Sequence, residues 1–158
     1  MGDMMTARKE IDDFLAVKRV AVIGVSRNPK DFSRSLFREF RRRGYDAIPV
    51  NPGTADMEGV RCYANVQDIE PRVDRALLVT PAGMSERVVR ECDAAGVCRV
   101  WLYRATGAGA VSPGALKLCQ DRGMPVVAGE CPFMFFPGAQ WPHRLHGCFR
   151  KVFGTYPK

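Results

Sequence analysis

One apolar segment constrains the fold of this chain more than any other: Val20-Ala21-Val22-Ile23-Gly24-Val25. Its β-branched residues follow one another without a polar interruption, which is typical of a strand buried on both faces. Such strands belong to parallel sheets, whose connections are helices. The next segment, 31–43, has apolar residues at helical spacing and is followed by Gly44. It therefore predicts the first connecting helix.

The rest of the chain repeats this alternation of apolar strand and amphipathic helix. We expect further strands at 45–50, 59–63, 75–79, 97–103 and 124–128, and helices at 8–18, 65–70, 85–95 and 113–122. Elements that alternate in this way form right-handed βαβ units. The predicted fold is α/β and Rossmann-like: a doubly wound, mostly parallel sheet of five or six strands with helices on both faces. Pro49 indicates that the second strand lies at an edge of the sheet, or that the strand ends there.

The length of 158 residues suits one domain. We expect that domain at 8–130, followed at 131–158 by an aromatic and basic C-terminal extension. The segment 132–137, Pro-Phe-Met-Phe-Phe-Pro, is too apolar to lie in water. It is expected to pack either on the domain or on a partner subunit. In the second case the chain would form a homodimer.

The positive charge of the chain, +7 in total, is concentrated in two blocks. Residues 27–44 hold seven basic side chains against two acidic ones, and residues 131–158 hold four basic side chains and no acidic one. This arrangement favours a polyanionic partner at a defined place. Nucleic-acid binding by the tail is less favoured, because its aromatic residues alternate with prolines and small residues in the manner of a packed segment.

The sequence has no apolar stretch of membrane-spanning length and no secretory signal at its start. The six cysteines form no C-x-x-C pair. We therefore expect a cytoplasmic protein with reduced thiols and no contact with a membrane.

The candidate binding residues lie in three loops that follow strands. In a doubly wound sheet, ligands bind at the carboxyl ends of the strands, and the N–H groups at a helix start attract phosphate. The candidates are Gly24, Val25, Ser26, Arg27, Lys30 and Ser33 after the first strand, Asn51 and Pro52 after the second, and Thr80 and Pro81 after the strand at 75–79.

The first loop departs from the fingerprint of dinucleotide-binding domains. That fingerprint, G-x-G-x-x-G, requires glycines where this chain has Ser26 and Pro29, and an acidic residue where it has Asn51. Serine hydroxyls and the cations of Arg27 and Lys30 suit phosphate in another way. An NAD(P)-binding oxidoreductase-like domain stays as the alternative, because Arg27 suits the 2′-phosphate of NADP.

Taken together, the loops resemble the CoA-binding domain family, small Rossmann-like proteins related to the CoA-binding part of the succinyl-CoA synthetase α subunit. The resemblance covers about residues 12–132 and is carried by 20–30, Gly44-Tyr45, 49–52, Gly59, Tyr63, Asp74, Thr80-Pro81, 100–102 and Cys131-Pro132. It implies that CoA phosphates are held by Ser26, Arg27, Lys30 and Ser33, that the adenosine-phosphate end meets Asn51 and Pro52, and that Thr80 and Pro81 line the opposite wall. Many relatives have a glutamine and a short loop where this chain has Tyr103 and the loop 104–110, which either shapes the pantetheine end or is a plain insertion.

No motif in the sequence predicts catalysis. His143 and His146 lack a third metal ligand, and Cys131 has no histidine near it in the sequence. We therefore expect no catalytic and no metal-binding residue. The expected function is binding of coenzyme A or an acyl-CoA through its phosphates, as a non-catalytic binding or regulatory module.

Overall fold

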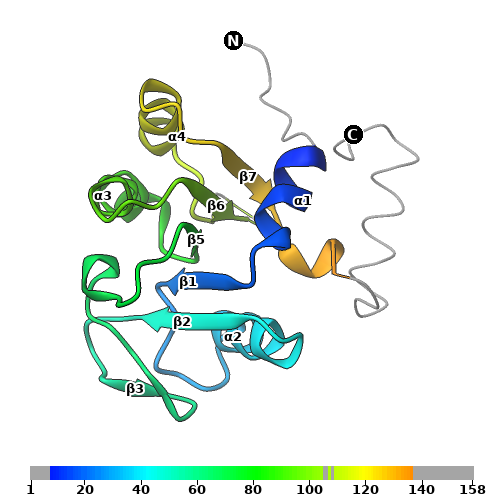
Figure 1. Cartoon of the computed structure of the whole chain (residues 1–158), viewed down its shortest axis with the longest axis vertical. Coiled ribbons are helices and arrows are strands. Elements are labelled where there is room, and N and C mark those ends of the chain that lie inside the picture. Colours follow the sequence, from blue (N-terminus) through cyan, green and yellow to red (C-terminus); the bar gives the residue numbers. More distant parts are fainter. Residues whose placement is uncertain (1–7, 105–106, 108, 137–158) are drawn as a thin grey trace.

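The computed structural model describes residues 8–104, 107 and 109–136 of the chain (Figure 1). Its centre is one sheet of five parallel strands: β1 (Arg19–Ile23), β2 (Asp46–Val50), β5 (Arg75–Leu78), β6 (Arg99–Tyr103) and β7 (Val126–Glu130). The strand order is β2-β1-β5-β6-β7. The chain steps outward from β1 to β2 and then returns to the other side of β1, which is the switch of direction that defines a doubly wound sheet. The predicted fold class is confirmed.

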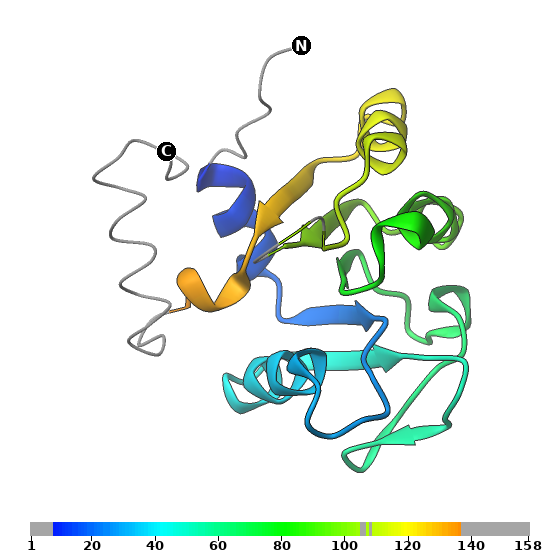
Figure 2. The ribbon, with the colours of Figure 1, turned by 180° about the vertical axis from the view of Figure 1, so that it is seen from behind.

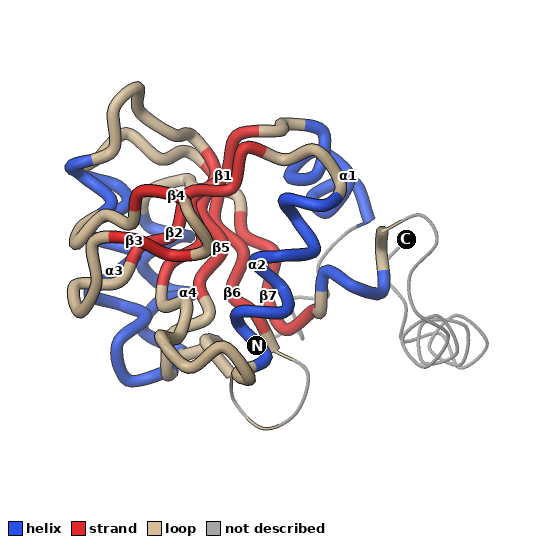
Figure 3. The backbone as a smooth tube through the Cα atoms, turned by 90° about the horizontal axis from the view of Figure 1, so that it is seen from below, coloured by secondary structure: helices blue, strands red, loops and turns tan. Residues whose placement is uncertain are grey.

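Helices cover both faces of this sheet, as Figure 3 shows. α1 (Arg8–Ala16) and α2 (Phe32–Arg42) lie on one face, and α3 (Ala82–Ala94) and α4 (Pro113–Asp121) lie on the other. Two of these helices begin at side-chain caps. The carboxylate of Asp31 accepts a hydrogen bond from the Ser33 N–H, and the hydroxyl of Ser112 accepts one from the Ala115 N–H.

The core divides into two apolar clusters, one on each side of the sheet. Neighbouring residues of a buried strand point to opposite faces, so Val22 packs toward α1 and α2 while Ile23 packs toward α3. Trp101 is completely buried on the α1–α2 side, where its indole N–H donates to the carbonyl of Glu130 over 2.9 Å. This two-sided burial explains the uninterrupted apolar strands.

The first residues after β7 belong to the cluster on the α1–α2 side. A short 3₁₀ helix, η2 (Pro132–Met134), directs Phe133, Phe135 and Phe136 into it, and all three are buried. The ring of Phe136 lies 5.0 Å from that of Phe40. Residues 137–158 lie outside the described part of the chain, so the homodimer and the packing of the extension as a whole stay predictions.

The structure differs from expectation between β2 and β5. The strand expected at 59–63 is replaced by a separate antiparallel hairpin, β3 (Asp56–Met57) and β4 (Val60–Arg61), beyond β2 (Figures 1 and 2). The chain reverses there because Glu58 and Gly59 both have positive φ, at 55° and 74°. The helix expected at 65–70 is only a single 3₁₀ turn, η1 (Val66–Asp68).

Pro49 lies in a strand where a proline is tolerated. β2 is an edge strand of the main sheet, as predicted. The carbonyl of Pro49 accepts a hydrogen bond from the Tyr63 N–H over 3.1 Å, on the side of β2 away from β1. The missing N–H of Pro49 thus costs the main sheet no hydrogen bond.

In the described part of the chain, no helix is long and apolar enough to span a bilayer.

Candidate functional site

The three predicted loops meet at the carboxyl edge of β2, β1 and β5. The Gly24 N–H donates to the Val50 carbonyl over 3.0 Å, and the Val79 N–H donates to the Ile23 carbonyl over 2.9 Å. A methyl group on Gly24 would lie 2.8 Å from Cγ2 of Thr80. The structure therefore brings the ends of the three loops together at the switch point of the sheet, where Gly24, Asn51, Pro52 and Thr80 line one cavity. Ser26, Arg27, Lys30 and Ser33, further along the first loop, do not line that cavity.

The first loop is held by hydrogen bonds among its own residues. The Ser33 hydroxyl accepts from the Ser26 N–H over 2.9 Å and donates to the Asp31 carboxylate over 2.5 Å. The Ser26 hydroxyl accepts from the Asn28 N–H over 3.1 Å. The two serines thus shape the loop, and Ser33 is buried while doing so. The role expected for their hydroxyls on phosphate stays a prediction.

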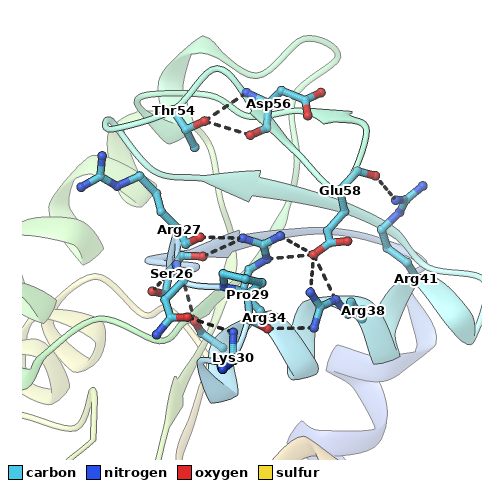
Figure 4. A network of polar contacts seen from close by, with 12 residues as sticks. Ser26, Arg27, Pro29, Lys30, Arg34, Arg38, Arg41, Thr54, Asp56 and Glu58 are labelled. Atoms are coloured by element: carbon cyan, nitrogen blue, oxygen red, sulfur yellow. Dashed lines mark hydrogen bonds and ion pairs between the residues drawn. The ribbon is translucent and has the colours of Figure 1, made fainter.

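Two cations of the loop are available to a ligand. Arg27 and Lys30 are exposed, and within the described residues neither side chain makes a hydrogen bond or an ion pair. The guanidinium of Arg27 points away from the neighbouring arginine cluster (Figure 4). These side chains have the charge and freedom that binding of an anion requires.

Asn51 ties the second loop to the first. Its amide nitrogen donates to the Val25 carbonyl over 2.8 Å, and its amide oxygen accepts from the Gly53 N–H over 2.7 Å. A methyl group on Gly53 would lie 3.3 Å from Nε of Arg27, so the glycine lets the arginine side chain pass over the turn. In this structure the Asn51 side chain therefore positions both loops.

Two cavities adjoin these loops. The smaller, of about 170 Å³, lies between the second and third loops. It is lined by Gly24, Asn51, Pro52, Asn65, Thr80, Arg87 and Glu91, together with the apolar side chains of Ile23, Val50, Ala64, Val66, Met84 and Val88. Pro81 stands next to it as the N-cap of α3. The hydroxyl oxygen of Thr80 is buried and has no hydrogen-bond partner among the residues described.

The larger cavity, of about 450 Å³, lies between the first loop and the β3–β4 hairpin. Its lining includes Arg27, Arg34, Asp56 and Glu58. Hydrogen bonds from Arg38 and Arg34 hold the pKa of the Glu58 carboxyl below its ordinary value. The sequence marked Arg34 and Arg38 only as members of a basic block. Their partner, Glu58, stands before Gly59 in the hairpin turn, 24 residues after Arg34. This Glu-Gly pair was the signal in the sequence that could have indicated it.

Cys131 lies directly after β7, in the apolar cluster on the α1–α2 side of the sheet. Burial raises the pKa of the Cys131 thiol to about 11, so it is protonated at neutral pH. No cluster of three or more His, Cys, Asp or Glu side chains suited to a metal ion occurs in the described ranges. His143 and His146 lie outside them.

Comparisons with known proteins identify the family to which this geometry belongs. Residues 18–137 match the model of the CoA binding domain. The chain is similar to the alpha subunit of the ADP-forming acetate–CoA ligase II of Pyrococcus furiosus, with 32% identity over 96 residues that cover 60% of this chain and 21% of that subunit. It is similar to the YneT protein of Bacillus subtilis, with 25% identity over 126 residues, or 79% of this chain and 90% of YneT.

A solved structure shares the same fold. A hypothetical protein from Pyrococcus horikoshii OT3 superimposes with a TM-score of 0.74 at 23% identity, over 84% of this chain and 94% of that protein. Against the ligases the match is partial, since this chain spans only about a fifth of the alpha subunit from Pyrococcus furiosus. The family model, in contrast, matches most of the chain, across all five strands of the main sheet. The chain belongs to the CoA binding domain family.

Proposed function

We propose that this protein binds coenzyme A or an acyl-CoA through its phosphates, as a binding or regulatory module without catalysis of its own. The observation that carries the proposal is a pair of exposed cations, Arg27 and Lys30, on a preformed loop at the switch point of a CoA binding domain; neither side chain has a hydrogen-bond or ion-pair partner among the described residues. CoA carries about four negative charges, which a positive loop at a helix start attracts. The names of the acetate–CoA ligases to which the chain is similar include CoA, which supports the same ligand here.

The residues present fit the ligand in two parts. The phosphates would lie at the first loop, against the side chains of Arg27 and Lys30. The smaller cavity, between Asn51 and Thr80, would take the adenosine end, since its wall combines polar groups with apolar side chains. The NAD(P) alternative is less favoured, because Asn51 uses its amide on the two loops and supplies no acidic acceptor for a ribose.

A thermal-shift panel with CoA, acetyl-CoA, NAD, NADP and ATP tests the proposal. A ligand at 100 times its Kd adds about 2.7 kcal/mol to the free energy of unfolding. For a chain of this size the melting temperature then rises by roughly 5–10 °C. We expect this rise with CoA and acetyl-CoA, and its loss in the double variant Arg27→Ala, Lys30→Ala.

The matched control removes two positive charges elsewhere. Arg90 on α3 and Lys117 on α4 are exposed and pair with Glu86 and Asp121 on their own helices. The double variant Arg90→Ala, Lys117→Ala should keep the shift with CoA. A shift with NADP alone, or an equal loss of the CoA shift in the control, would contradict the proposal.

A further inference from the structure

Arg34 joins three parts of the structure through one guanidinium group (Figure 4). It lies in the first turn of α2, and only 11% of its side chain is exposed. One terminal nitrogen, Nη1, donates to the carbonyls of Ser26 and Arg27, over 3.3 and 3.1 Å. The remaining donors, Nε and Nη2, bond one carboxylate oxygen of Glu58 on the hairpin. The first loop, which is the proposed phosphate loop, is therefore connected to α2 and to the hairpin at this residue.

These bonds determine which way the loop directs its N–H groups. In a trans peptide the carbonyl and the following N–H point in opposite directions. Because Arg34 holds the carbonyl of Ser26, the N–H of Arg27 points away from Arg34. That N–H makes no hydrogen bond within the described residues, whereas the next one, of Asn28, bonds the Ser26 hydroxyl. Within the described residues, Arg34 thus leaves one backbone donor of the loop without a hydrogen bond, on the side of the loop that faces away from Arg34.

Glu58 is held in place by the same helix. Besides the bonds from Arg34, its carboxylate accepts from Nε and Nη2 of Arg38, over 3.0 and 2.7 Å, and its carbonyl accepts from Arg41 over 3.3 Å. Its φ of 55° is a conformation that residues other than glycine, asparagine and aspartate rarely adopt. The hairpin turn thus places an acidic side chain, rather than glycine, in this conformation and against the arginines of α2, which points to a use for the side chain.

We propose that Arg34 is a positioning residue for the phosphate loop, with Glu58 as its anchor, so that the β3–β4 hairpin controls the affinity of the loop for CoA. This inference rests on the proposed function. Neither residue needs to touch the ligand. Arg34 orients the carbonyls of Ser26 and Arg27, and Glu58 keeps the guanidinium in the orientation that reaches them.

The first test compares Arg34→Lys with Arg42→Lys by calorimetric titration with CoA. Lysine keeps the charge but lacks the planar fork that bonds the loop and Glu58 together. We expect the Kd for CoA to rise about tenfold in Arg34→Lys, as for the loss of a charge-assisted hydrogen bond. Arg42 pairs with Glu39 at the far end of the helix, so Arg42→Lys should leave Kd unchanged. An unchanged Kd in Arg34→Lys would overturn the proposal.

The second test uses Glu58, because a positioning role and a purely electrostatic role predict opposite changes in the Kd for CoA when Glu58 is replaced. Glu58→Ala makes the protein more positive, which by charge alone would tighten CoA binding. Positioning predicts a Kd about five times higher in Glu58→Ala, and recovery of most of the affinity in Glu58→Gln, whose amide oxygen still accepts from Arg34. Tighter binding by Glu58→Ala would overturn the proposal and assign Glu58 as a competitor of the ligand.

A third readout separates positioning from general loss of structure. In the unliganded protein, the amide NMR signals of Arg27 and Asn28 should move in Arg34→Lys and Glu58→Ala, while the signals of α3 and α4 stay in place. Adding Arg34→Lys to Glu58→Ala should cost little further affinity, since both changes release the same contact. If the unmodified protein binds no CoA, the proposed function fails; if it binds CoA and all of these variants bind equally well, only this inference fails.

Discussion

Gly24, directly after β1, lies close against Thr80. Its φ is +94°, and a methyl group there would lie 2.8 Å from the Thr80 side chain and 3.1 Å from the Thr80 backbone nitrogen. Gly44, after α2, has a similar φ of +84° but open space around it. Substitutions at the two glycines therefore distinguish the effect of backbone strain from that of steric overlap.

We expect Gly24→Ala to lower the free energy of unfolding by about 2–4 kcal/mol, the sum of strain and overlap. Gly44→Ala should cost only the strain, about 1–2 kcal/mol. Urea denaturation of both variants measures the difference. Equal losses would mean that Thr80 moves aside and that the close approach of the two loops is not required.

Asn51 shows how far residue identity predicts a role. Its place after the second strand was predictable from the alternation of elements, and the absence of an acid there argued against a dinucleotide site. That its amide bonds the Val25 carbonyl, 26 residues away, was not. Such a bond depends on how two loops meet, which no local pattern records.

At the scale of elements, α2 carries the highest net positive charge of the helices and strands that the structure describes, and its arginines form two groups. Arg34, Arg38 and Arg41 bond Glu58, as described above. Arg42 and the C-cap residue Arg43 pair with Glu39. Hydrogen bonds from Arg42 and Arg43, with Arg42 the larger cause, lower the pKa of Glu39 from 4.5 to about 2 against the opposing effect of burial. The Glu39 side chain is only 15% exposed.

This low pKa predicts a particular dependence of stability on pH. A carboxyl whose pKa is lower in the folded state stabilises the fold above its unfolded pKa, and the contribution is lost as pH falls through the folded value. The contribution of Glu39 should thus be complete above about pH 5 and disappear between pH 4.5 and 2. Because Arg42 is largely exposed, we expect about 1–2 kcal/mol.

The measurement is the unfolding free energy of Glu39→Gln against the unmodified protein from pH 2 to 7. The difference should be constant near neutrality and shrink in acid. Asp121→Asn, which removes an exposed pair with Lys117 on α4, serves as the control and should change stability by less than about 0.5 kcal/mol. A difference that stays constant down to pH 2 would contradict the role assigned to the two arginines.

The hairpin at 56–61 is the element that the sequence predicted least well. Its strands are two residues each, too short for an alternating pattern to indicate them. The apolar residues in 59–63 suggested one strand of the main sheet, yet the turn at Glu58 and Gly59 makes a separate pair. The hairpin is held by tertiary interactions: α2 bonds Glu58 in its turn, and β4 packs beside β2.

For the whole molecule, the described core does not end at the last strand of the sheet. Phe136 is 5% exposed and packs on Phe40 and Tyr45, residues of α2 and of the segment that leads into β2. The segment after β7 thereby crosses the sheet toward its opposite edge.

We expect Phe136→Ala to lower the free energy of unfolding by about 3–5 kcal/mol, as for a buried aromatic residue. Phe32, 38% exposed at the start of α2, is the matched control, and Phe32→Ala should cost distinctly less. Thermal and urea unfolding of both variants tests this. A small effect of Phe136→Ala would place the end of the stable core at β7.

The sequence by itself determined the fold class, the main strands and their crossover helices, and the three loops that meet at the site. The reason is that buried strands, amphipathic helices and helix caps are each specified by residues that lie close together in the sequence. The tertiary structure alone decided that Ser33 and Asn51 brace the loops, that the hairpin stands apart from the sheet, and that Arg34 reaches Glu58. Those arrangements join residues far apart in the chain, and whether such side chains meet depends on the packing of whole elements.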